Sequence, residues 1–195
     1  MRAFIHELRT SLLAVITLGL LLCLAYPLIV WGLAQVVFPR QANGSLIIQN
    51  QKIIGSELLA QNFTDPRYFH PRPSAAGENG YDGIRSGGSN LGPLSKKLLE
   101  AVTLRVQNYR AENHLAPQVP VPADAVTASA SGLDPHISLE NALLQAPRVA
   151  AARGVGLQTI LKQIGHHTSG RDLGILGEPR LNVLLLNLAL DRIAR

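Results

Sequence analysis

Apolar residues fill the first fifth of the chain without interruption by charge. Residues 10–39 contain no charged side chain, and Arg9 and Arg40 bracket the run. A helix over this run, at about 1.5 Å of rise per residue, exceeds the roughly 20 residues needed to cross a bilayer. It is also about twice as long as the apolar region of a signal peptide. The pattern predicts a retained transmembrane helix over residues 11–38, after a short segment at 1–10.

Several positions inside this span can contact neighbouring membrane helices. Pro27 lacks a backbone N–H and should bend or locally open the helix. Small residues let another helix approach closely. The candidate contacts with membrane partners are Ala14, Gly19, Ala25, Pro27 and Gly32. Cys23, the single cysteine, also lies in the span, so the remainder of the chain can form no disulfide.

The polar remainder, residues 39–195, begins with strand and loop patterns. The runs 46–48 and 53–54 are β-branched and flank a polar turn, which predicts a hairpin or two adjacent strands. Residues 64–92 are rich in Pro, Gly, Ser and Asn and predict a long loop.

Three later stretches have apolar residues at helical spacing. The first covers residues 93–113, with Asn90 as the expected N-cap. The second runs over 138–153, with its first residue as N-cap, and Pro147 should break or kink it. The third covers about 157–170.

Residues 181–190 are apolar except for two asparagines, and this segment is too short to be a second span. We expect a buried strand that leads into a terminal turn of helix. Short strands mixed with helices predict one α+β soluble domain over residues 39–195, attached to a single transmembrane helix.

Charge and aromatic content argue against nucleic-acid binding. The formal net charge is +5, of which +4 follows the span, and the basic residues are spread along the chain. No aromatic residue follows Tyr109. Nucleic-acid binding surfaces combine a basic stripe with aromatic stacking platforms. We therefore expect no nucleic-acid partner.

One segment suggests a catalytic alternative. Ser129 or Ser131 could act as a nucleophile, with His136 as base and Asp134 to orient it. The chain would then be a membrane-anchored periplasmic hydrolase. A local cluster seldom places these groups correctly, and no G-x-S-x-G elbow is present. A serine-rich turn that caps a helix is the favoured interpretation.

Metal and cation binding receive little support. The six histidines show no metal-ligand spacing. In another alternative, the domain would act as a cap that collects potassium ions, which would depend on local acidic residues. Arginines are interleaved with these acidic residues, so a solvated surface of mixed charge is favoured. The acidic residues in question are Glu57, Asp65, Glu78 and Asp82.

Six ordered blocks carry a family resemblance. They are QANGSL, QNFTDPRYFHPRPSA, SGGSNLGP, VTASASGLDPHIS, QAPRVAAARG and LNVLLLNLALD. Together they closely resemble the C subunit of the bacterial Kdp potassium-transporting ATPase. The chain contains neither the Asp-Lys-Thr-Gly motif of a P-type pump nor the Thr-Val-Gly-Tyr-Gly filter of a potassium channel.

The resemblance implies a non-catalytic subunit that assembles and stabilises a potassium uptake complex. The implied partners are a channel-like potassium-translocating subunit, a P-type ATPase subunit and a small membrane subunit. The implied role includes that of a catalytic chaperone, which raises the ATP affinity of the ATPase subunit. No tightly bound cofactor is expected, and ATP would act through the ATPase subunit. The matching nucleotide-linked residues are Ser86, Gly87, Gly88, Ser89, Asn90, Gln145 and Arg148.

The resemblance also implies a location in the bacterial inner membrane, with a cytoplasmic N-terminus and a periplasmic soluble domain. Basic residues on the two sides of the span favour this orientation only weakly. A domain outside the cytoplasm cannot touch cytoplasmic ATP. An effect on nucleotide affinity must then pass through the membrane subunits as a coupling free energy.

Overall fold

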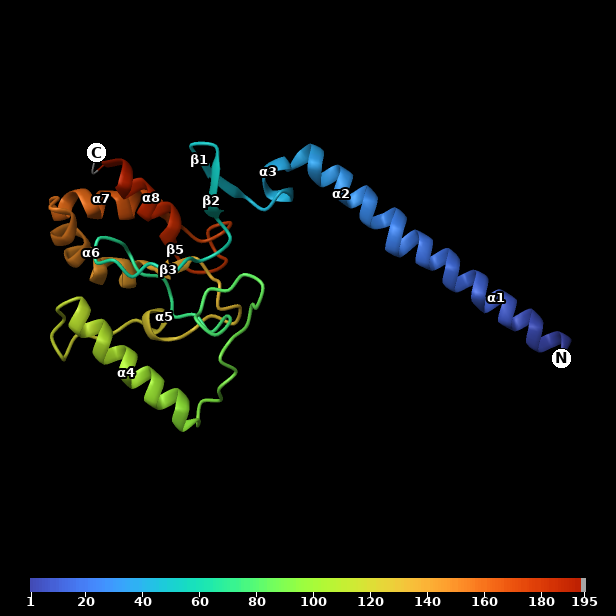
Figure 1. The fold of residues 1–195 in the computed structure, drawn as a ribbon, viewed down its shortest axis with the longest axis horizontal. Helices are drawn as coiled ribbons and strands as arrows, with labels where there is room; N and C mark the ends of the chain where they lie inside the picture. The colour runs from blue at the N-terminus through green and yellow to red at the C-terminus, as the bar shows by residue number, and fades with distance from the viewer. Residues whose placement is uncertain (194–195) are drawn as a thin grey trace. The chain divides into compact units, whose positions relative to one another are not determined.

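The computed structural model describes residues 1–193 of the chain (Figure 1). These residues form two compact units, which divide between Ile54 and Gly55.

The first unit is dominated by one long apolar helix. It comprises α1 (Arg2–Gly19), the π-helical stretch η1 (Leu20–Ala25) and α2 (Tyr26–Val37). The most apolar stretch of 18 residues in this continuous helix has a mean hydropathy of 2.6. The helix has no buried residue, and it is long and apolar enough to cross a membrane. Both features agree with a single membrane anchor.

The π-helical stretch η1 lies directly before Pro27, which occupies the first turn of α2. A proline ring clashes with the carbonyl oxygen four residues earlier in an ordinary helix. The wider π turn relieves this clash. The expected local opening of the helix near Pro27 is therefore confirmed.

A short connection follows the long helix. It contains α3 (Pro39–Ala42), β1 (Leu46–Gln49) and β2 (Lys52–Ser56). The strands pair as a two-stranded sheet, which confirms the expected hairpin. Asn50 and Gln51 both have positive φ, the backbone of a tight hairpin turn whose twist matches its strands.

The second unit combines helices with one small sheet, in agreement with the expected α+β class. Its helices are α4 (Lys96–Glu112), α5 (Ala123–Val126), α6 (Leu139–Arg153), α7 (Leu157–His167) and α8 (Val183–Ile193). Its strands are β3 (His136–Ser138), β4 (Thr168–Ser169) and β5 (Arg180–Asn182), ordered β3-β5-β4 and antiparallel.

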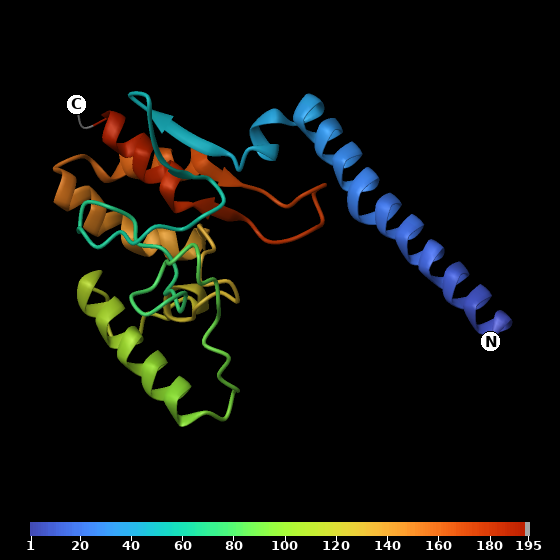
Figure 2. The same cartoon turned by 45° about the vertical axis from the view of Figure 1, so that its right-hand side comes forward.

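The core of this unit lies among α6, α7, α8 and β5. Figures 1 and 2 show these elements grouped together, with α4 on the opposite side of the coil around α5. Aliphatic side chains and one phenylalanine fill the core. Its fully buried members include Phe69, Val149, Ile160, Ile164, Leu181 and Leu186.

Two sequence-based expectations about helix limits are wrong: a start at Pro93 with Asn90 as cap, and a break at Pro147. Helix α4 begins at Lys96, because the Ser95 hydroxyl accepts the Leu98 N–H, and Asn90 lies outside it with a φ of +50°. Helix α6 continues through Pro147. That proline is exposed, so the carbonyl that it leaves unpaired is on the solvent side, where water can satisfy it.

The expected buried strand over residues 181–190 is also wrong. The strand ends at Asn182, and α8 follows at once. Val183, Leu186 and Leu190 are buried at helical spacing, and the Asn182 side chain accepts the Leu185 N–H at 3.1 Å. The helical spacing could not be recognised in the sequence, because the run is almost continuously apolar and nearly every position is suitable for burial.

Candidate functional site

Two buried amide side chains hold the segment before Pro71 against α6 and α8. Asn187 accepts the Phe69 N–H at 2.8 Å and donates to the Phe69 carbonyl at 2.9 Å. Gln145 accepts the His70 N–H at 2.7 Å and donates to the His70 carbonyl at 3.1 Å. Each amide side chain therefore replaces the hydrogen bonds that a neighbouring strand would supply.

Arg148 extends this arrangement one turn further along α6. Its guanidinium donates to the carbonyls of Pro66 and Tyr68 at 2.7 and 3.1 Å, and to Asn113 at 3.0 Å. Burial lowers the pKa of Arg148, although Glu112 at 3.8 Å acts in the opposite direction. Both of the predicted nucleotide-linked residues on α6 thus bind the protein's own backbone.

The predicted nucleotide-linked segment 86–90 lies in a different place, against the turn around Ser131. The Ser86 hydroxyl and the Gly87 N–H both donate to the Ser131 carbonyl, at 3.0 and 2.9 Å. A Cβ on Gly88 would lie 3.1 Å from a facing backbone oxygen. The last two residues of the segment are exposed. Gly88 therefore allows close backbone packing, and the Gly87 N–H is already bound within the protein.

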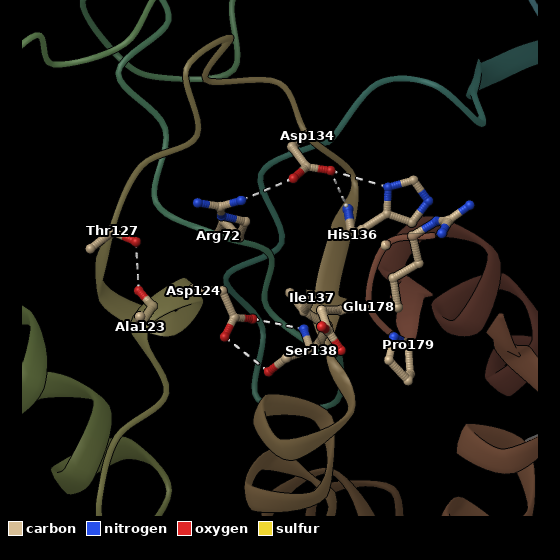
Figure 3. A pocket seen from close by; sticks show the side chains of 12 residues that line it. Arg72, Ala123, Asp124, Thr127, Asp134, His136, Ile137, Ser138, Glu178 and Pro179 are labelled. Carbon is tan, nitrogen blue, oxygen red and sulfur yellow. Dashed lines mark hydrogen bonds and ion pairs between the residues drawn. The ribbon is translucent and has the colours of Figure 1, made fainter. Parts of the chain in front are cut away.

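Asp134 connects the loop at residue 72 to strand β3. One carboxylate oxygen accepts from Arg72 Nη1 at 3.0 Å, and the other accepts the backbone N–H of His136 at 3.0 Å and lies 3.1 Å from its Nδ1 (Figure 3). Burial raises the pKa of Asp134, but the hydrogen bonds from His136 and Arg72 outweigh it and hold this pKa below its usual value.

Two open cavities meet at these three residues. One, of about 560 Å³, is also lined by Asp124, Ser138, Glu178 and Arg180. The other, of about 690 Å³, is also lined by Ser86, Ser129 and Ser131. This surface, built from loops and β3, is the candidate functional site of the second unit.

The catalytic constellation is only half assembled here. Asp134 does orient His136, and both serines line the same cavity as the imidazole. Among the described contacts, however, neither serine hydroxyl is bonded to His136. Ser131 Oγ instead accepts the Leu133 N–H at 3.1 Å and lies 3.3 Å from Ser129 Oγ. The serines form a turn, as the favoured interpretation expected.

Three of the four acidic residues considered for cation collection form ion pairs with arginines. Asp65 pairs with Arg67 at 3.4 Å. Glu78 and Asp82 both face Arg85, at 3.7 and 3.6 Å. Over residues 1–193 no group of three or more potential metal-ligating side chains comes together.

Sequence reasoning missed the structural role of two polar side chains. Asp124 accepts from the N–H and the hydroxyl of Ser138 at 2.8 and 2.9 Å, and from Asn141 at 2.9 Å. Asn187 looked like an interruption of an apolar strand. Its position on the buried face of a helix is the signal that could have revealed it, once the helical period was recognised.

A long apolar helix with no buried residue, joined to a folded α+β domain, defines a class: a membrane-anchored protein with an extramembrane domain. The comparisons with known proteins make this specific. The family model described as "KdpC: K+-transporting ATPase, c chain" matches residues 8–192. The chain therefore belongs to the KdpC family.

Curated relatives agree over nearly the whole length. The potassium-transporting ATPase KdpC subunit of Nitratidesulfovibrio vulgaris is 52% identical over 95% of this chain and 94% of its own. That of Myxococcus xanthus is 54% identical, over 97% and 87% of the two chains. That of Mycobacterium tuberculosis strain H37Rv is 52% identical, over 96% and 99%. Membership of this family is at odds with the hydrolase alternative, since the family supplies a non-catalytic subunit.

Proposed function

We propose that this chain assembles and stabilises an ATP-driven potassium uptake complex in the bacterial inner membrane. The observation that carries the proposal is the span itself, which is 36 residues long and has no residue buried within the chain. A helix with no internal packing is free to dock on the membrane helices of other subunits. The relatives' shared name, potassium-transporting ATPase KdpC subunit, supports the same role.

The proposed docking partners are the channel-like potassium-translocating subunit, the P-type ATPase subunit and the small membrane subunit. Ala14, Gly19, Ala25 and Gly32 are the positions where their helices can approach closely. The widened turn before Pro27 adds backbone carbonyls that a neighbouring helix can bind.

Exchanging residues 10–37 for an unrelated apolar helix tests this docking. The exchanged chain should still enter the membrane but should no longer co-purify with the other subunits. Leu21→Ile, a conservative change in the same exposed helix, is the matched control and should co-purify normally. Normal co-purification of the exchanged chain would refute specific docking through the span.

We further propose that the soluble domain is extracytoplasmic and raises the ATP affinity of the ATPase subunit indirectly. The buried contacts of Gln145 and Arg148 support an indirect effect, because neither side chain can reach a nucleotide without releasing backbone groups. Segment 86–90 would act in the same way, through its packing on the turn at Ser131.

The ATP concentration for half-maximal ATPase activity, measured with and without this chain, tests the coupling. Omission should raise that concentration, whereas Glu100→Gln, an exposed change on α4, should leave it unchanged. Direct ATP binding to the isolated chain would contradict the proposal.

Orientation has its own test. Lys97 is exposed on α4, and Cys23 is the only native thiol. In a Cys23→Ser background, Lys97→Cys should react with a membrane-impermeant thiol reagent in intact spheroplasts. Labelling only after lysis would place the domain in the cytoplasm.

A further inference from the structure

The loop between β4 and β5, residues 170–179, carries a cluster of exposed aliphatic side chains. Leu173 is 88% exposed, Ile175 75% and Leu176 56%. Figure 2 shows this segment, red-orange in the ribbon, extending away from helices α6, α7 and α8. Clustered exposed apolar residues, unlike scattered ones, are typical of an interaction surface.

Two ion pairs and several backbone hydrogen bonds hold the loop in one shape. Arg171 Nη2 binds both carboxylate oxygens of Glu178 at 2.9 and 2.8 Å. Arg180 Nη2 binds both oxygens of Asp172 at 3.2 and 3.0 Å. Asp172 and Leu176 also exchange a pair of backbone hydrogen bonds at 2.8 and 2.9 Å. The apolar tip is therefore ordered before any partner binds, which reduces the entropy lost on association.

Neither the backbone conformation nor the packing of Leu173 favours a leucine at this position. Its φ is +54°, a left-handed conformation that is strained for a bulky side chain. Its side chain is almost fully exposed and has no packing that offsets this strain. Asparagine tolerates the same backbone conformation far better. A leucine here is explained by a contact outside the chain.

The charges beside the tip indicate what kind of surface it meets. The loop and its flanks contain two arginines and two carboxylates, and each arginine is neutralised by a carboxylate of the same loop. An anionic lipid surface is recognised by unpaired basic residues beside the apolar ones, and this loop provides none. An uncharged apolar pocket in a protein is the matching surface.

The location of that protein follows from the length of the connection. Residues 38–54 join the span to the second unit, and a fully extended chain of that length reaches about 60 Å. The second unit therefore works beside the bilayer, where membrane subunits of the complex emerge. The base of the loop is continuous with the candidate site, since Glu178 and Pro179 line the cavity beside Asp134 (Figure 3).

We propose that the β4–β5 loop inserts Leu173, Ile175 and Leu176 into an uncharged apolar pocket on the extramembrane surface of another subunit of the complex. The inference rests on the proposed assembly function and identifies a second contact, separate from the span. The span fixes the chain in the membrane, and the loop fixes the orientation of the soluble domain on its partner.

Titration of full-length chain into a complex lacking it, in detergent, tests the proposal with potassium-stimulated ATPase activity as readout. Leu173→Asn and Ile175→Asn should each raise the half-saturating concentration about tenfold or more, the loss expected for one buried aliphatic side chain. Leu99→Gln, a change of an exposed leucine on α4, is the matched control and should leave it unchanged. The unfolding midpoint of the isolated Leu173→Asn chain should be unchanged or higher.

Each failure has a different meaning. If wild-type chain does not associate at all, the assembly function itself is wrong. If wild type associates and the loop variants match it, or Leu99→Gln weakens binding equally, the loop proposal is overturned. The same holds if Leu173→Asn lowers the unfolding midpoint. If the loop variants weaken association only in vesicles with anionic lipid, the loop contacts lipid and not the proposed pocket. If wild type self-associates and Leu173→Asn abolishes this self-association, the loop contacts a second copy of the chain.

Discussion

Replacing Asn187 should destabilise the soluble domain much more than its size suggests. The side chain is only 1% exposed, and its two amide atoms satisfy both backbone groups of Phe69. Asn187→Ala leaves a buried N–H and a buried carbonyl unpaired, at about 1–3 kcal/mol each. We expect a total loss of about 2–6 kcal/mol, a large part of the roughly 5–15 kcal/mol that stabilises a typical domain.

Urea unfolding of the full-length chain in detergent, followed by far-ultraviolet circular dichroism, measures this loss. The span remains helical in detergent and contributes a constant background. Asn187→Leu fills the same volume without the hydrogen bonds, so it should also be destabilised, which separates lost bonds from a cavity. Asn108→Ala, on the exposed face of α4, is the control and should change stability by less than about 0.5 kcal/mol.

Unfolding of Asn187→Ala and Asn108→Ala at the same urea concentration would refute a stabilising role for the two hydrogen bonds between Asn187 and Phe69. So would an Asn187→Leu variant as stable as wild type, since the loss in Asn187→Ala would then come from volume alone.

Further substitutions test other interactions that stabilise the soluble domain. The hydrogen bond from His70 at 2.7 Å lowers the pKa of Glu112. This pair therefore stabilises the fold above the ordinary carboxyl pKa, and the stabilisation is lost as the pH falls through the lowered pKa. The difference in urea midpoint between wild type and Glu112→Gln should be present at neutral pH and should shrink in acid. Ser138→Ala removes the N-cap of α6 and should lower the free energy of unfolding by about 0.5–2 kcal/mol; an unchanged thermal midpoint would contradict the capping role. At Gly132 a Cβ would lie 2.7 Å from two backbone atoms, whereas at Gly154 none lies within 4 Å, although both glycines have a φ of +66°. Gly154→Ala should therefore cost about 1 kcal/mol, and Gly132→Ala should cost clearly more, as equilibrium unfolding of the two variants would show.

Much of the fold could be predicted from local patterns. The hairpin near residue 50, the capping of α6 by Ser138 and its end at Gly154 all depend on residues within a few positions of one another. The start of α4 was mistaken, because Asn90 and Ser95 are both acceptable caps and only the folded backbone selects between them. The candidate site could be predicted only in part: Asp134 and His136 are near in sequence, but Arg72 comes from a distant loop.

The sequence by itself determined that the chain has a helix long and apolar enough to span a membrane, an α+β domain and membership of the KdpC family, because composition, short-range periodicity and ordered blocks are properties of the linear chain. Only the tertiary structure decided what the buried polar residues do. Gln145 and Asn187 hold backbone groups 75 and 118 positions away, and no local pattern encodes such a pairing. It likewise decided that Leu173 stays exposed on a rigid loop, since burial depends on how the rest of the chain packs.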